Sequence, residues 1–525
     1  MEILLPLLEV AAAQGGNLLV LALVLPVLAL LLAFPLGGPW AGRVALAALA
    51  LGLGVAVAIV AAVLQGGTAL NYNLGGWAPP LGVALKADGL SATMLLVTAV
   101  ILGAIGLYAR PEFRVPPGTR ETRAPLAFWT LLLGVWAGLN AVFLGQDLFN
   151  LYVALELVTF SAVPLVCLSG RPETLAAALR YLLFALLGSI LYVLGAALLY
   201  GAYGTLDIAL LSARLTADLA SGEPAGPVVL VAVALMTVGL LAKTALFPLH
   251  LWLPPAHAGA PPAASAVLSA LVVKASFFLI LRLWLDVLPA PLTQQTAPLL
   301  AALGVAAILF GGAQALRQAR LKMLIAYSTV AQIGYLFLVF PLTLGSGAAP
   351  AGPEAAGALT GGMLQLISHA FAKASMFMGA GVIAAALGHD QIRNLGGIAR
   401  VLPITVLAFA VASLSLVGLE PSGGYAAKTL LTVAADASGQ WWWVLALNTG
   451  GLLTATYLLW VLFNALSGLS RPPTLLMPPR RYQELLVLGL ALGALVIGLM
   501  PPASFDLIQI GRQSVTEVVH GVGLR

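Results

Sequence analysis

The chain has 525 residues, of which 61% are hydrophobic and only 8% are charged. That composition excludes a soluble globular protein of this size, because too little polar surface remains to face water. The net charge of +5 does not indicate a nucleic-acid partner, since the basic residues are scattered between apolar segments and not clustered. The sequence therefore predicts a polytopic membrane protein of the all-α class.

Fourteen apolar stretches of helix-spanning length follow one another along the chain, separated by charged, proline-rich and glycine-rich breaks. We predict transmembrane spans at residues 17–36, 41–64, 88–108, 125–145, 148–169, 175–200, 227–252, 261–285, 298–316, 321–341, 358–386, 402–435, 441–466 and 483–501. Between the sixth and seventh spans, residues 205–222 predict a short amphipathic helix at the membrane interface. The N-terminal segment holds Glu2 and Glu9 but no basic residue, which argues against a signal peptide.

Basic residues alternate between the two sides of this predicted bundle. After the odd-numbered spans lie Arg43, Arg110, Arg114, Arg120, Arg123, Arg171, Arg317, Arg320, Lys322, Arg393, Arg400, Arg471, Arg480 and Arg481. After the even-numbered spans lie only Lys86, Arg214 and Arg282. Because Lys and Arg concentrate in cytoplasmic loops, we expect a multi-pass protein of a prokaryotic-type inner membrane with both termini on the non-cytoplasmic side.

Two predicted spans carry interruptions beside a lysine. Pro248 follows Lys243 in span seven, and Pro421 with two glycines precedes Lys428 in span twelve. Proline removes a backbone donor and clashes with the preceding turn, so both spans are predicted to be discontinuous. The triplet Ala-Lys-Thr recurs beside both breaks, five spans apart. This spacing fits two inverted five-helix repeats, spans 4–8 and 9–13, and divides the chain into N-terminal helices at 1–120, a first repeat at 121–290, a second repeat at 291–470, and a C-terminal helix and tail at 471–525.

Four lysines fall inside predicted spans: Lys243, Lys274, Lys373 and Lys428. Burying an ammonium group in lipid costs about 2.5–3.5 kcal/mol, so an intramembrane lysine is a functional-site candidate. Arginine stays protonated under nearly all conditions, whereas a desolvated lysine can gain and lose a proton near neutral pH. The arginines of this chain lie almost entirely in loops or at span ends. The buried cations are therefore the ones that we expect to titrate.

Glu156 lies near the middle of span five with no charged residue within a helical turn. A buried charge requires a partner, and we predict that Glu156 pairs with Lys243. Movement of the carboxylate toward Lys243 would hold the lysine protonated, and withdrawal would release its proton. The alternative is a static ion pair that fixes helix register.

Three other polar groups complete the predicted site. His369 lies one helical turn before Lys373 on the same face, a spacing that allows proton transfer directly or through one water. For His369 and His250 the alternative is a hydrogen-bonded core histidine. Glu420, in the second break, is either a titrating partner for Lys428 or a carboxylate at a helix end.

No ligand set for a cofactor or a metal is visible. The single cysteine, Cys167, can neither hold an iron–sulfur cluster nor close an internal disulfide. There is no glycine-rich phosphate loop and no haem attachment motif, and the scattered histidines lack nearby carboxylates or thiolates. We therefore expect no cofactor and no metal in this chain.

Four motifs occur in the order LLAKTALFPLHLWLPPAHAGAPP, LKMLIAYSTVAQIGY, SHAFAKASMFMGAG and GLEPSGGYAAK. Over about residues 120 to 470 they resemble the antiporter-like proton-translocating subunits shared by respiratory complex I (NADH-quinone oxidoreductase), Mrp-type cation/proton antiporters and membrane-bound hydrogenases. The resemblance implies a fourteen-helix fold with inverted repeats and discontinuous spans seven and twelve. For the site it implies a modulating Glu–Lys pair, a continuing path and a terminal charge, formed here by Glu156, Lys243, Lys274, His369, Lys373 and Lys428.

This sequence departs from the family in two places. Gly-Leu-Glu-Pro replaces the usual Gly-Leu-Pro-Pro, so Glu420 could alter proton exit or ion preference. The chain is also expected to lack the long lateral helix of the distal complex I subunit, which makes the shorter paralogues the better guides.

The sequence thus predicts a subunit that moves protons from the cytoplasm along a row of buried Lys, His and Glu and releases them near Lys428. Any redox or hydrolytic chemistry would belong to partner membrane subunits, as in a proton-translocating NADH/quinone-type oxidoreductase or a hydrogenase complex. One alternative is an Mrp-type antiporter subunit that exchanges sodium for protons without redox coupling. The other is a structural membrane subunit whose charges only hold helices together.

Overall fold

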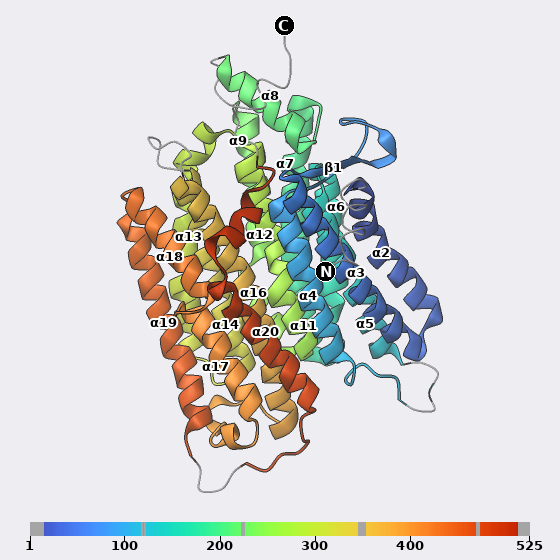
Figure 1. Ribbon diagram of the computed structural model, residues 1–525, viewed down its shortest axis with the longest axis vertical. Coiled ribbons are helices and arrows are strands. Elements are labelled where there is room, and N and C mark those ends of the chain that lie inside the picture. The colour runs from blue at the N-terminus through green and yellow to red at the C-terminus, as the bar shows by residue number, and fades with distance from the viewer. Residues whose placement is uncertain are drawn as a thin grey trace.

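The computed structural model describes residues 15–116, 119, 122–221, 226–344, 353–468 and 473–512. Its helices run side by side along the long axis of the molecule, with the N-terminal pair α2 and α3 at one edge and α18 and α19 at the other (Figure 1). Within these residues, thirteen helical segments are long and apolar enough to cross a membrane. A further span is divided into two shorter helices, α17 and α18. The predicted all-α, fourteen-span fold is therefore confirmed.

The first group of spanning helices comprises α2 (Gly15–Leu36), α3 (Gly38–Gly66), α4 (Gly89–Ala109), α5 (Arg123–Leu144), α6 (Leu148–Val166), α7 (Pro172–Tyr203) and α9 (Pro227–Thr244). The eighth span, residues Pro262–Val287, consists of α11 (Pro262–Val267), a π-helical segment (Leu268–Val272), α12 (Val273–Arg282) and a second π-helical segment (Leu283–Val287). The remaining spans contain α13 (Ala290–Leu316), α14 (Leu321–Leu336), α15 (Val339–Leu344), α16 (Pro353–Leu387), α17 (Pro403–Val417), α18 (Gly423–Ala437), α19 (Trp441–Leu466) and α20 (Arg481–Leu499).

Short elements connect these spans. The predicted amphipathic helix is present as α8 (Ile208–Ala220), at one end of the bundle in Figure 1. A β-hairpin of β1 (Leu70–Asn73) and β2 (Ala84–Ala87), paired antiparallel, lies between α3 and α4 and was not predicted. Aspartates begin several helices here: the carboxylates of Asp88, Asp147 and Asp207 accept backbone N–H bonds at the starts of α4, α6 and α8, which satisfies amides that no helical carbonyl can reach.

Spans seven and twelve are both broken, as predicted. In the first, α9 ends at Thr244, Ala245 is left-handed (φ 59°), and the chain resumes helical structure only in α10 (Leu253–Gly259). In the second, α17 ends at Val417, Gly418 is left-handed (φ 86°), and α18 begins at Gly423. The recurring Ala-Lys-Thr triplet, however, is not a structural correspondence, because it precedes the break in span seven and follows it in span twelve.

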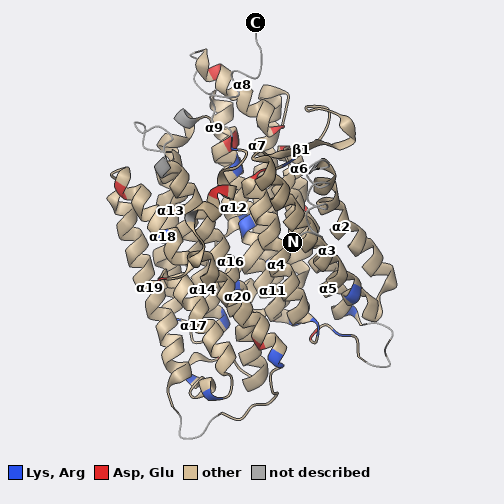
Figure 2. Cartoon of the chain, in the orientation of Figure 1, with Lys and Arg blue, Asp and Glu red and all other residues tan. Residues whose placement is uncertain are grey.

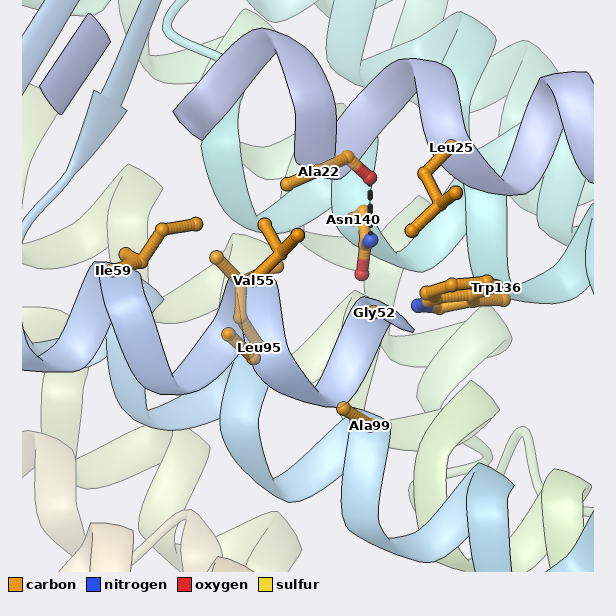
Figure 3. A pocket seen from close by; sticks show the side chains of 10 residues that line it. Ala22, Leu25, Gly52, Val55, Ile59, Leu95, Ala99, Trp136 and Asn140 are labelled. Carbon is orange, nitrogen blue, oxygen red and sulfur yellow. Dashed lines mark hydrogen bonds between the residues drawn. The ribbon is translucent and has the colours of Figure 1, made fainter. Parts of the chain in front are cut away.

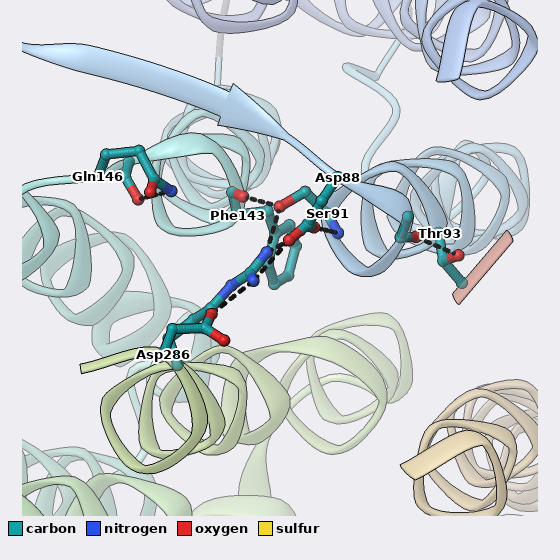
Figure 4. A network of polar contacts seen from close by, with 9 residues as sticks. Asp88, Ser91, Thr93, Phe143, Gln146 and Asp286 are labelled. Carbon is teal, nitrogen blue, oxygen red and sulfur yellow. Dashed lines mark hydrogen bonds and ion pairs between the residues drawn. The ribbon is translucent and has the colours of Figure 1, made fainter. Parts of the chain in front are cut away.

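The eighth span is the most enclosed, with its side chains buried among the surrounding helices. Arg282 lies inside this span, not in the connection where the sequence had placed it. Its guanidinium donates to both Asp88 oxygens at 2.6 Å, to Asp286 at 2.7 Å and to Ser91 Oγ at 2.9 Å (Figure 4). A buried arginine is tolerated here because the carboxylates neutralise it. The cluster ties the start of α4 to the end of the eighth span.

Replacing Asp88 by Asn is expected to destabilise the fold by about 3 to 5 kcal/mol, because it leaves a buried guanidinium with one charge partner fewer. Burial acts to raise the pKa of Asp88, but Arg282 outweighs burial and lowers this pKa to about 2. A carboxylate with a depressed pKa stabilises the folded state above its unfolded pKa, so this contribution persists at neutral pH and disappears only as the pH falls toward 2. Thermal unfolding in detergent measures the loss.

Asp286→Asn is the matched control, because Asp286 contacts the same guanidinium but its side chain is 25% exposed. We expect a clearly smaller loss of stability from this variant. Equal losses from the two substitutions would contradict the assignment of Asp88 as the main partner.

Candidate functional site

Charged residues are sparse along the middle of the bundle and gather toward its ends (Figure 2). Of the four lysines predicted inside spans, Lys243 and Lys274 in the first predicted repeat and Lys373 in the second are buried, whereas Lys428 in the second is half-buried. Each ammonium group donates to carbonyl or side-chain oxygens of its own span or of a neighbouring helix.

The predicted contact between Glu156 and Lys243 is present. Lys243, in the last turn of α9, donates to Glu156 Oε1 at 3.0 Å and to Thr159 Oγ1 at 3.0 Å, both on α6. Ser189 of α7 also donates to the same Glu156 oxygen. The ammonium and the carboxylate thus neutralise each other, and hydroxyl groups complete their hydrogen bonds.

Close packing of α7 on α9 positions this pair. Gly188 and Gly239 face each other, and a Cβ at either position would collide with the carbonyl oxygen of the other. Small residues at such a crossing let the two backbones approach closely. As a result Ser189, next to Gly188, and Lys243, one turn after Gly239, both reach Glu156.

Between Lys243 and the eighth span lie a small cavity and a hydrogen bond between two hydroxyl groups. Thr244 Oγ1 donates to Ser276 Oγ at 3.0 Å. Lys243, Thr159, Tyr181 and Ser276 line the cavity together with apolar side chains. Because the lining offers several polar atoms, the cavity is suited to hold water.

Lys274 lies two residues after the π-helical segment Leu268–Val272 and is fully buried. Its Nζ donates to the carbonyl oxygen of Ser269, five residues earlier in the same span. In a π-helical turn the backbone hydrogen bonds no longer follow the α-helical pattern, so the Ser269 carbonyl can accept a hydrogen bond from the lysine side chain. Ser269 Oγ in turn bonds Thr329 Oγ1 of α14 at 2.9 Å, which links this span to the second repeat.

Lys373 and His369 both lie in α16, fully enclosed. Lys373 Nζ donates to the Ile325 carbonyl at 3.1 Å and to Ser328 Oγ, both on α14. Both ring nitrogens of His369 lack a hydrogen-bond partner among the described residues. The proton exchange predicted between His369 and Lys373 stays a prediction.

Lys428 lies in α18, where the second break supplies backbone oxygens to it. Its Nζ donates to Val417 O at 2.7 Å and to Leu416 O at 3.4 Å, and it lies 4.6 Å from the ring centroid of Tyr335. Glu420 is exposed in the same break. The ion pairs of the described chain do not include one between Glu420 and Lys428, so a role for Glu420 at this lysine stays a prediction.

His250 lies in the turn of the first break. Its ring stacks on Phe247 with centroids 5.5 Å apart and meets the edge of Phe310 at 4.9 Å. Its Nδ1 has no hydrogen-bond partner in the described part of the chain. The hydrogen bonds around Lys243 do not include His250, so the structure does not join it directly to the Glu156 pair.

Two buried residues were missed from the sequence. His257 lies in α10 with its ring fully enclosed, and Lys322 lies in the first turn of α14, only 7% exposed. The sequence groups Lys322 with the basic residues of a connection, but in the structure the chain after α10 covers it, and its Nζ donates to Ala260 O at 2.5 Å. For His257 the sequence signal was its position in the proline-rich break, LPPAHAGAPP.

A second small cavity lies apart from these residues, among α2, α3, α4 and α5 (Figure 3). Asn140 donates to Ala22 O at 2.8 Å there, and its own Oδ1 has no partner among the described residues. The other labelled side chains around it, such as Leu25 and Trp136, are apolar. This cavity shares no residue with the contacts of the buried lysines.

The paired broken helices and the enclosed lysines define the chain as an antiporter-like integral membrane subunit with many spans. Residues 145–454 match the family described as "NADH:quinone oxidoreductase/Mrp antiporter, TM", and the chain belongs to this family, as its motifs predicted.

Its relatives include both redox-linked and antiporter-type proteins. "NADH-quinone oxidoreductase subunit N" of Desulforudis audaxviator (strain MP104C) is 36% identical over 396 residues, covering 72% of this chain and 75% of the relative. The Mrp complex from Dietzia sp. DQ12-45-1b contains a chain that superposes with a TM-score of 0.84 at 26% identity, covering 95% of this chain and 97% of that one. A chain of the membrane-bound sulfane sulfur reductase, an archaeal respiratory membrane complex, gives a TM-score of 0.83 at 26% identity, with 96% and 99% covered. These similar chains are components of multi-subunit membrane assemblies.

Proposed function

We propose that this chain is a proton-translocating subunit of a complex I-like or antiporter-type assembly. Protons would pass along the buried row of Glu156, Lys243, Lys274, His369, Lys373 and Lys428. One observation carries the proposal: Lys274, Lys373 and Lys428 are held by carbonyl and hydroxyl oxygens and form none of the ion pairs described. An ammonium group without a carboxylate partner can lose its proton without leaving a buried anion behind.

Lys243 differs from the other three lysines because it has a carboxylate partner, Glu156. Its carboxylate lies 3.0 Å from Lys243 Nζ and holds the ammonium form in place. A shift of Glu156 toward Ser189 alone would weaken this hold, and Lys243 would then pass its proton toward the cavity that it shares with Ser276. The Glu156–Lys243 contact would therefore act as the control point of the row.

The orientation of transport follows from the distribution of basic loops. With both termini on the non-cytoplasmic side, protons enter from the cytoplasm and leave near Lys428. Glu420, exposed in the adjacent break, would lie at or near this exit. Partner membrane subunits would supply the redox reaction or the sodium pathway that drives the movement.

Replacing Lys274 by Met tests the function, because methionine fills a similar volume but carries no proton. Inside-out membrane vesicles from the native host, with the variant in place of the chromosomal copy, are driven in one arm by NADH and in the other by a sodium pulse. We expect Lys274→Met to reduce the initial rate of luminal pH change at least about 100-fold in the arm to which wild type responds.

Lys86→Met is the matched control, because Lys86 lies in β2 outside the spans. It should transport at the wild-type rate. A response of wild type to NADH without sodium identifies a redox-coupled subunit, and a strict sodium requirement identifies the antiporter alternative. Unchanged transport by Lys274→Met, with normal assembly, would contradict a proton row through the eighth span.

A further inference from the structure

His257 is the buried group that the proposed row does not yet use. Its ring is fully enclosed and stacks on Phe377 of α16 with centroids 4.6 Å apart. Neither ring nitrogen has a hydrogen-bond partner among the described residues. Buried polar atoms normally pair with protein or water, so two orphan nitrogens on one ring mark a place where something else binds or passes.

Lys322 lies next to the end of α10, the helix that contains His257. Its Nζ donates to Ala260 O, directly after the helix that contains His257. On its outer side, the Lys322 backbone N–H donates to Asp390 Oδ2 at 3.3 Å, and Asp390 pairs at 2.9 Å with Arg320, whose side chain is 54% exposed. A pair of charged side chains, Arg320 and Asp390, therefore links the protein surface to the backbone of Lys322.

On the inner side, the ring of His257 packs against α16, the helix that carries Lys373. His257 thus lies between the segment that Lys322 binds and the helix that carries Lys373. Phe377, against which the ring stacks, is one turn from Lys373 on α16.

We propose that His257 and Lys322 form the cytoplasmic entrance through which protons reach Lys274 and Lys373; this inference rests on the proposed proton-translocating function. A proton from the cytoplasmic side binds the ring nitrogen that carries a lone pair. The proton on the other nitrogen passes inward, directly or through water, to the deprotonated amine of Lys274 or Lys373. The ring then returns to its starting tautomer, so no charge accumulates on it. Lys322 positions the entrance by holding the end of α10.

His257→Phe is the test variant, because phenylalanine keeps the ring volume and the stacking on Phe377 but cannot carry a proton. In the vesicle assay, we expect the initial rate to fall at least about tenfold, since a positioned proton-transfer group contributes at least this much. Millimolar imidazole in the medium should restore much of the lost rate, because a diffusible proton carrier replaces the missing ring. A ring that serves only packing would show no such rescue.

His389→Phe is the control, because His389 lies in the connection after α16 and is only partly buried. It should retain the wild-type rate with or without imidazole. If His257→Phe assembles poorly, His257→Gln provides a smaller polar substitute with the same expected loss and rescue. Lys322→Met should reduce the rate without rescue by imidazole, since its role is to position α10.

The outcomes separate this entrance from the function on which it rests. Wild-type transport by His257→Phe together with failure of Lys274→Met overturns the entrance and leaves the proton row intact. A loss that imidazole does not restore overturns the entrance as well, because it indicates a structural role. Unchanged transport in both variants overturns the row and the entrance together.

Discussion

Lys243→Ala is expected to leave the protein assembled in the membrane and to stop proton movement, with a loss of at least about 100-fold. The substitution removes the ammonium that bonds Glu156 and Thr159. Glu156 then loses its charge partner, but Ser189 still bonds it and its side chain remains 13% exposed, so the carboxyl can be solvated or protonated. Vesicle transport measures the loss, and native gel electrophoresis of solubilised membranes measures assembly.

A static ion pair predicts a different pattern. If the two charges only fix helix register, Lys243→Ala should lose assembly, and the double variant Glu156→Gln with Lys243→Ala should regain it, because no unpaired charge remains. For a proton pathway, the double variant assembles but stays inactive. Glu156→Gln alone should leave the contacts with Ser189 and Thr159 in place. We expect it to reduce the transport rate by about tenfold, since Lys243 no longer has a charged partner to set its proton affinity.

Lys373→Met should abolish transport to a similar extent, at least about 100-fold. Lys373 is fully buried in α16 and donates across to Ile325 O and Ser328 Oγ of α14. Methionine fills the space without a titrating group, so any proton that reaches His369 has no acceptor one turn further along the helix. The vesicle assay gives the rate, and the amount of assembled protein normalises it.

Lys373→Arg distinguishes loss of a proton carrier from loss of a hydrogen bond. Arginine retains a positive charge and several donors for the same oxygens but does not deprotonate in proteins. We expect the Arg variant to be as inactive as the Met variant. Substantial transport by Lys373→Arg would show that charge alone suffices at this position, and proton release from Lys373 would be the wrong mechanism.

The fold could be predicted from the sequence because its signals are local. Runs of apolar residues give the spans, and Pro248 and Pro421 indicate the two breaks that the structure contains. The contact between Glu156 and Lys243 followed from a physical requirement, since each buried charge needs a partner. The family motifs add the order of the remaining lysines.

The burial of three charged or titratable side chains could not be predicted, because it depends on contacts between segments that are distant in sequence. The sequence places Lys322 beside Arg320 at the start of a span, and nothing local indicates that the end of α10 covers it. Arg282 was assigned to a connection because it lies near the end of its span, yet Asp88, distant in sequence, neutralises it there. His257 has no charged neighbour in sequence, and only the enclosure of both ring nitrogens distinguishes it from an ordinary core histidine.

The bond from Lys274 to Ser269 stays within a single span. If this lysine gave up its proton, the hydrogen bond that would weaken lies within its own helix, so no bond to a partner helix would be affected. Lys373, in contrast, joins α16 to α14, and discharging it weakens a connection between two helices. In the proposed row, discharge of Lys274 would therefore leave the contacts between helices unchanged, whereas discharge of Lys373 would loosen the contact between α16 and α14 and so transmit a mechanical signal to neighbouring helices.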